Sequence, residues 1–111
     1  MLYTTFTVKD KEYKARLSAK TCVELEKKLG ANPLNAFIKV AQTNEVPQLD
    51  TLITILHASL QAYQHGMSMD DVYALYDDFV DEGNSLMELI PLILEIFKVS
   101  GFFKPEEEKN A

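Results

Sequence analysis

Cysteine is nearly absent from this chain, since Cys22 is the only one among its 111 residues. A single thiol excludes an intrachain disulfide framework and a metal site built from several thiolates. Cys22 could act as a nucleophile only with a base brought from elsewhere in the fold. Its place on the apolar side of an expected helix favours a small packing residue instead. The cysteine content therefore predicts a protein of a reducing compartment.

Long uninterrupted apolar runs are also lacking. The longest apolar stretch, residues 86–99, is interrupted by two Glu, one Pro and one Lys. It is shorter than the roughly 20 residues that a membrane-spanning helix needs. The first residues contain neither a basic segment nor an apolar core, so we expect no signal peptide. We expect a soluble, cytoplasmic protein that makes no membrane contact.

Positive charge is scarce and unevenly distributed, and the net charge is -6. Residues 1–42 contain eight basic and four acidic side chains, whereas residues 43–111 contain three basic and thirteen acidic ones. General nucleic-acid binding depends on Lys and Arg at the phosphates, so we expect none. The two ends are either ordinary solvated surfaces or a means of orienting neighbouring copies or a charged partner.

The acidic residues around Gly83 do not match a calcium-binding loop. An EF-hand places oxygen ligands at positions 1, 3, 5 and 12 and glycine at position 6. Counting from Asp78 puts Gly83 in the glycine position but apolar side chains at positions 3 and 12. Counting from Asp77 puts Glu82 where glycine belongs. We interpret these residues as a solvated helix face followed by a capped turn.

Other motifs for chemistry are missing as well. The four glycines lie far apart, each after an expected helix, so they form no phosphate-binding loop. His57 and His65 are eight residues apart, beyond the spacing of four that brings two imidazoles of one helix to one metal. We therefore predict that the protein is not an enzyme, with no catalytic residues, no cofactor and no metal.

What the sequence does contain is helical periodicity after a short β segment. Residues 3–8 and 12–17 flank a polar turn and predict an N-terminal β-hairpin over residues 3–17. Apolar spacing and capping signals then predict five helices. Their expected bounds are Ser18 or Thr21 to Gly30, Asn32-Pro33 to about Ala41, Gln48 to Gln64, Ser68 to Gly83, and Ser85 to Gly101. The predicted fold class is mainly α, with about five helices in a compact bundle. Residues 1–103 form one domain, and residues 104–111 a flexible acidic tail.

The fifth helix is apolar on nearly every side, and Pro91 should bend it or divide it in two. A helix without a polar side is either central in its domain or covered by another chain. We expect that another polypeptide shares this surface. The candidate protein-binding residues are Leu89, Leu92, Ile93, Ile96, Phe97, Phe102 and Phe103.

Several segments resemble the tail assembly chaperones encoded by long-tailed (siphovirus) phages and prophages of Gram-positive bacteria. The segments are Thr21 to Gly30 followed by Asn32-Pro33-Leu34, Ile55 to Gln61, Tyr76-Asp77-Asp78 through Gly83, and Ser100-Gly101-Phe102-Phe103. The resemblance implies a small helical protein that binds the tape measure protein before the tail tube polymerises and that is absent from the finished virion. It also implies a gene just upstream of the tape measure gene, often with a longer frameshifted form, and no catalytic residues.

The resulting hypothesis is a self-associating tail assembly chaperone that binds the tape measure protein, a helical client, through its fifth helix. Two alternatives remain. The protein could be a structural component of the tail or of the head–tail connector, retained in the particle. It could also be an acidic protein-binding regulator that mimics nucleic acid with its Asp-rich fourth helix.

Overall fold

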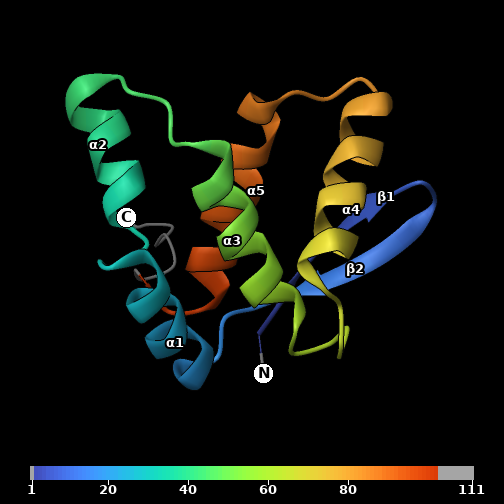
Figure 1. Ribbon diagram of the computed structural model, residues 1–111, viewed down its shortest axis with the longest axis horizontal. Helices are drawn as coiled ribbons and strands as arrows, with labels where there is room; N and C mark the ends of the chain where they lie inside the picture. The colour runs from blue at the N-terminus through green and yellow to red at the C-terminus, as the bar shows by residue number, and fades with distance from the viewer. Residues whose placement is uncertain (1, 103–111) are drawn as a thin grey trace, which may run out of the picture.

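The computed structural model describes residues 2–102, which form five helices and one two-stranded antiparallel sheet (Figure 1). The elements are β1 (Thr4–Val8), β2 (Lys11–Ala15), α1 (Ala19–Leu29), α2 (Asn35–Thr43), α3 (Leu49–Leu60), α4 (Met69–Asp81) and α5 (Leu86–Val99). The predicted class, mainly α with an N-terminal hairpin, is confirmed. The predicted acidic tail, residues 104–111, lies outside the described residues.

The hairpin lies with one face on the helices. Its strands pair so that Phe6 is opposite Tyr13, and the two rings stack with their centroids 5.4 Å apart. Val8, Tyr13 and Ala15 are buried, whereas the alternate residues of β1 are exposed. This alternation is the sign of a sheet with one buried face. That face meets the helices directly, with β2 against α3 and β1 against α5 and α4, and the hairpin lies on the same side of the domain as α4 (Figure 1).

The central helices are α3 and α5, with α1 and α2 on one side and α4 and the hairpin on the other (Figure 1). The core takes most of its fully buried side chains from these two helices, namely Leu52, Ile53, Ile55, Leu56, Leu60, Leu89, Ile93, Ile96 and Phe97. Helix α3 contacts α1, α4, α5 and β2. It is therefore the element around which the domain is assembled.

Short-range hydrogen bonds define where three of the helices begin. Ser18, rather than Thr21, caps α1, because its side chain accepts a hydrogen bond from the Thr21 N–H at 3.2 Å. The capping boxes that the sequence predicts at α4 and α5 are both present, in each case a serine paired with an acidic residue three positions later. Two other boundaries differ from the predicted ones. Helix α2 begins at Asn35 rather than at Asn32-Pro33, and α3 ends at Leu60 rather than at Gln64.

Helix α5 is continuous through Pro91, so of the two effects expected of this proline, a bend or a division, the division does not occur. Proline lacks the N–H that would bond to the carbonyl of Met87, one turn earlier. Met87 is 55% exposed, so water can reach that part of the helix. The helix thus crosses the domain as one continuous element and packs against α3.

Acid should weaken the starts of α4 and α5. The Ser85 hydroxyl and backbone N–H hold the pKa of Glu88 below its ordinary value of 4.5, and the Ser68 backbone N–H and hydroxyl do the same for the pKa of Asp71, ordinarily 3.8. A carboxylate with a lowered pKa in the folded state stabilises it at neutral pH, and this contribution is lost as the pH falls from those ordinary values through the lowered ones. Urea unfolding at pH 7 and at pH 3 should therefore show lower stability in acid.

The control is the double variant Glu88→Gln with Asp71→Asn, whose side chains accept hydrogen bonds but do not titrate in this range. Its stability should change less between pH 7 and pH 3 than that of the natural sequence. An equal loss in both proteins would contradict the assignment of this acid sensitivity to the two capping boxes.

Candidate protein-binding surface

Most of the protein-binding residues predicted on α5 lie inside the domain. Leu89, Ile93, Ile96 and Phe97 are each 2% exposed or less. The expectation that this part of α5 has more apolar surface than the domain can cover is wrong. Helix α3 and strand β1 both pack against α5, and the ring of Phe97 meets that of Phe37 from α2 edge-on, with centroids 5.3 Å apart.

The three remaining predicted residues are placed differently. Leu92 is half-buried and lines a small apolar recess with Phe6 and Leu56. Phe102 is also half-buried, and its ring lies 4.7 Å from that of Phe97. Phe103 lies outside the described residues. The structure therefore gathers the described members of this set in and around the core and leaves little of them for a partner to contact.

Every helix carries at least one other exposed large apolar side chain, namely Val23, Ile38, Leu49, Tyr73, Val80, Met87 and Leu94, and on α4 they belong to a regular row. Met69, Tyr73, Tyr76 and Val80 fall within an arc of about 60° at 100° per residue, with spacings of four, three and four. Tyr73 is 48% exposed and Val80 41% exposed, while the other two are half-buried. We refer to these four residues as the α4 apolar row.

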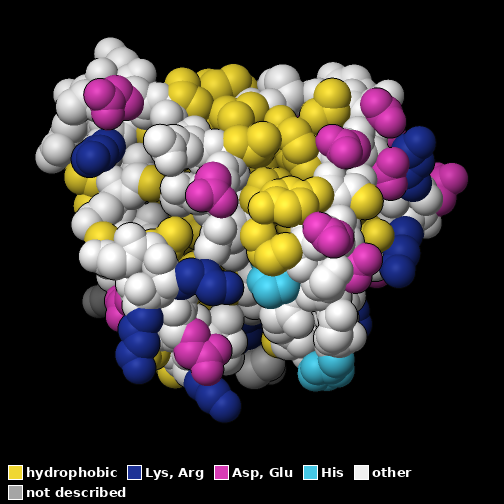
Figure 2. Space-filling model, viewed as in Figure 1, with side chains coloured by type: hydrophobic (Ala, Val, Ile, Leu, Met, Phe, Trp, Pro, Cys, Tyr) yellow, Lys and Arg dark blue, Asp and Glu magenta, His cyan; other side chains and the backbone are white. Residues whose placement is uncertain are grey.

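Tyr73 and Val80, the exposed members of the α4 apolar row, lie on the side of α4 away from the hairpin, whereas Tyr76 lines a recess with Phe6 and Val8 of β1. The opposite side of α4 also meets the hairpin: Ala74 and Asp78 line a cleft with Tyr13 of β2, and Glu82, just after the helix, accepts a hydrogen bond from the Lys9 N–H at 2.7 Å. Figure 2 shows hydrophobic side chains gathered between α3 and α4 and along the upper edge. That edge is where α3 begins, α4 ends and α5 begins (Figure 1), and Leu49 and Met87 are exposed there.

Carboxylates border this apolar area. Asp70, Asp77 and Asp81 are exposed and lie along the next row of α4, about 70–110° around the helix from the centre of the apolar row. Figure 2 shows acidic side chains beside the hydrophobic ones. An apolar row next to an acidic row is an arrangement that can contact an apolar partner while the rest of the surface stays hydrated.

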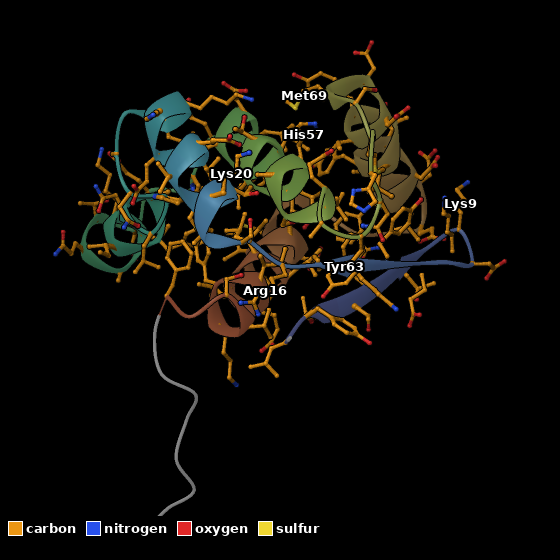
Figure 3. The ribbon with its side chains drawn as sticks, turned by 90° about the horizontal axis from the view of Figure 1, so that it is seen from below. Lys9, Arg16, Lys20, His57, Tyr63 and Met69 are labelled. Atoms are coloured by element: carbon orange, nitrogen blue, oxygen red, sulfur yellow. The ribbon has the colours of Figure 1, made fainter. Side chains whose placement is uncertain are left out.

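His57 helps to fix α4 against α3 at the other end of this surface. Its Nε2 lies 3.0 Å from the carbonyl oxygen of Met67, which also accepts a hydrogen bond from Gln61 Nε2 at 2.8 Å. Figure 3 shows His57 on α3 close to Met69 at the start of α4. Since these bonds come from two side chains of the α3 region, the position of α4, and with it the apolar row, is set by polar contacts as well as by the core.

Several titratable residues lie outside this surface. An open cleft of about 590 Å³ between β2 and α4 is lined by His65, Asp71, Asp78 and Tyr13, among others. Burial raises the pKa of Tyr13, and the nearby charge of Asp78 raises it further. Burial, followed by the charge of Glu26, also raises the pKa of the Cys22 thiol, against the smaller opposite effect of Arg16.

Within residues 2–102, no three His, Cys, Asp or Glu side chains come together as a metal ion would require. No helix in the described part of the chain has both the length and the apolar character needed to cross a membrane.

These observations define a small helical domain with an N-terminal hairpin and an exposed apolar row on its fourth helix. The chain belongs to DUF6096, a family of unknown function, which matches residues 2–111. Neither a curated protein nor a solved structure matches the chain.

Proposed function

We propose that this protein is a tail assembly chaperone of a long-tailed phage or prophage, which binds the tape measure protein and keeps it soluble in the bacterial cytoplasm during tail assembly. Two kinds of support favour this function. One is the resemblance of several segments, among them residues 21–30 and 100–103, to chaperones of this kind. The other, which carries the proposal, is the α4 apolar row with its acidic border.

The geometry of the row suits a helical client. Its spacing of four, three and four residues is the spacing by which one helix contacts another along a seam. An amphipathic client helix lying along α4 would cover the exposed parts of Tyr73 and Val80. Tyrosine is enriched among the few residues that contribute most of the binding free energy of an interface. The neighbouring carboxylates would remain in water and keep the complex soluble.

The direct test is co-expression with the tape measure protein that the proposal places in the adjacent, downstream gene. We expect the tape measure protein to become soluble and to copurify with this chain. Mass spectrometry of purified virions separates the proposal from a structural role in the tail or head–tail connector, because a chaperone should be absent from the particle. Failure to form a complex, together with no gain in client solubility, would overturn the proposal.

The row of Asp70, Asp77 and Asp81 favours one second candidate, an acidic regulator that binds a basic protein. Binding through exposed charges is screened by salt, with a Debye length of about 10 Å at 0.1 M and about 3 Å at 1 M. Such a complex should dissociate between these salt concentrations. A complex formed through the α4 apolar row should persist, because burial of apolar surface does not depend on charge screening.

A further inference from the structure

Among the residues that the structure describes, the rest of the domain forms hydrogen bonds with the outer edge of one hairpin strand, β2, but not with the outer edge of the other, β1. At the outer edge of β2, the Lys14 N–H donates to Gln64 Oε1 at 3.0 Å, and the Lys14 carbonyl accepts from Gln64 Nε2 at 2.8 Å. Two residues on, the Arg16 N–H donates to the Ser59 carbonyl at 2.9 Å. The outward-facing backbone groups of β2 are therefore occupied by the end of α3 and the turn after it.

The register shows which residues of β1 face its own outer edge. In an antiparallel pair, residues directly opposite each other either both bond across the pair or both point outward. Thr5 is opposite Lys14, whose backbone groups point outward to Gln64, and Thr7 is opposite Glu12, on the same edge. Thr5 and Thr7 thus present their N–H and C=O groups along the outer edge of β1. Among residues 2–102 these groups have no protein hydrogen-bond partner.

Strand β1 also lacks the features that usually prevent an edge from pairing with another strand. Proteins protect such edges with charged side chains, proline or β-bulges. Residues 3–8 contain no charged residue and no proline, and the pairing of β1 with β2 proceeds residue for residue without a bulge. Threonine, phenylalanine and valine are moreover favourable residues for strands.

We infer that the outer edge of β1 pairs with the same edge of a second copy of this chain, which makes a continuous four-stranded antiparallel sheet around a twofold axis. The axis passes beside Phe6, so that Thr5 of each copy bonds to Thr7 of the other through four backbone hydrogen bonds. The two Phe6 side chains then adjoin on the face that packs on the helices, and the threonines adjoin on the solvent face.

A second copy fits this edge better than a foreign strand because the edge is complementary to itself. Thr5 and Thr7 are symmetric about Phe6, so an antiparallel copy places every outward donor opposite an acceptor. Each chain has a net charge of -6, and residues 3–8 are a segment where two such chains meet without like charges in contact. Figure 3 shows β1 on the side of the molecule opposite His57 and Met69. Tyr73 and Val80, the exposed members of the α4 apolar row, are not part of the β1 edge, so a dimer leaves them free.

The test compares two substitutions at one position. Thr7→Pro removes the outward N–H but no hydrogen bond to β2, whereas Thr7→Val keeps the N–H and the strand propensity. In sedimentation experiments over a range of concentrations, the natural chain and Thr7→Val should form a dimer with a dissociation constant on the order of micromolar, as small interfaces do. Thr7→Pro should weaken the dimer at least about tenfold, because each copy loses one intermolecular hydrogen bond.

Hydrogen exchange on the natural chain supplies a readout that needs no variant. The amides of Thr5 and Thr7 should exchange more slowly as the protein concentration rises, while the amide of Phe6, bonded to β2, should not change. Three results would each overturn the inference: a monomer at concentrations up to about 1 mM, a Thr7→Pro dimer as tight as that of Thr7→Val, or Thr5 and Thr7 exchange independent of concentration. None of them bears on client binding at the α4 apolar row.

Discussion

Replacing Phe97 with alanine should destabilise the protein by about 3–5 kcal/mol, the usual cost of removing a buried phenylalanine. The side chain is 0% exposed, and its ring packs against Phe37 of α2 and Phe102 beyond α5. Its removal leaves a cavity where three segments distant in the sequence meet. Since a typical domain has about 5–15 kcal/mol of stability, this loss should leave the fold marginal. Chemical denaturation followed by circular dichroism measures the change.

The matched control is Leu94→Ala, one turn earlier on the same helix. Leu94 is 36% exposed, so its truncation should cost less than about 1 kcal/mol. Together the two variants test whether α5 is a core helix or a binding surface. If Phe97→Ala kept its full stability and lost only its affinity for the client, Phe97 would belong to an interface, and the packing described here would be incorrect.

Replacing Val80 with aspartate should weaken client binding about 30-fold or more while the fold stays intact. Val80 is 41% exposed on α4, so the monomer tolerates a carboxylate there. In a complex the client helix would cover that carboxylate and remove it from water without a partner, which costs 2 kcal/mol or more as a rough lower bound. Titration of the variant with the tape measure protein gives the affinity, and thermal unfolding checks the fold.

Val23→Asp is the control for this substitution. Val23 is 50% exposed on α1, so the same chemical change is made at an equally accessible helical position outside the α4 apolar row. It should leave the affinity within about twofold of the natural value, since exposed positions outside an interface contribute little. Equal effects of the two substitutions would contradict the placement of the client on α4 and would point to a general effect of added negative charge.

Several features of the fold could be predicted because they depend on neighbours in the sequence. The capping boxes of Ser68 with Asp71 and of Ser85 with Glu88 each close within four residues, so the sequence alone predicts them. The hairpin is likewise a local structure, with Phe6 and Tyr13 brought together by a turn at Lys9 and Asp10. The choice between Ser18 and Thr21 could not be made from the sequence, because both have the hydroxyl that a cap requires.

The end of α3 was predicted wrongly for a reason that lies outside its own segment. The apolar spacing continues to Tyr63, but the helix ends at Leu60. Gln64 then turns its side chain to the backbone of Lys14 and to the Leu60 carbonyl. A contact over fifty residues of sequence separation has no local signal. The protected edge of β2, and therefore the difference between the two hairpin edges, became visible only in the structure.

The sequence by itself determined that the protein is mainly helical, where its hairpin lies, and which serines begin α4 and α5, because hydrogen bonds and periodicity within a segment decide these features. Only the tertiary structure decided which apolar side chains are covered. Periodicity predicts which apolar residues share one side of a helix. Whether such a residue is buried, as Phe97 is, or exposed, as Tyr73 is, depends on which helices pack against that side. Packing partners come from distant parts of the chain. The composition of the sequence therefore predicted the binding surface on α5, whereas the structure favours α4.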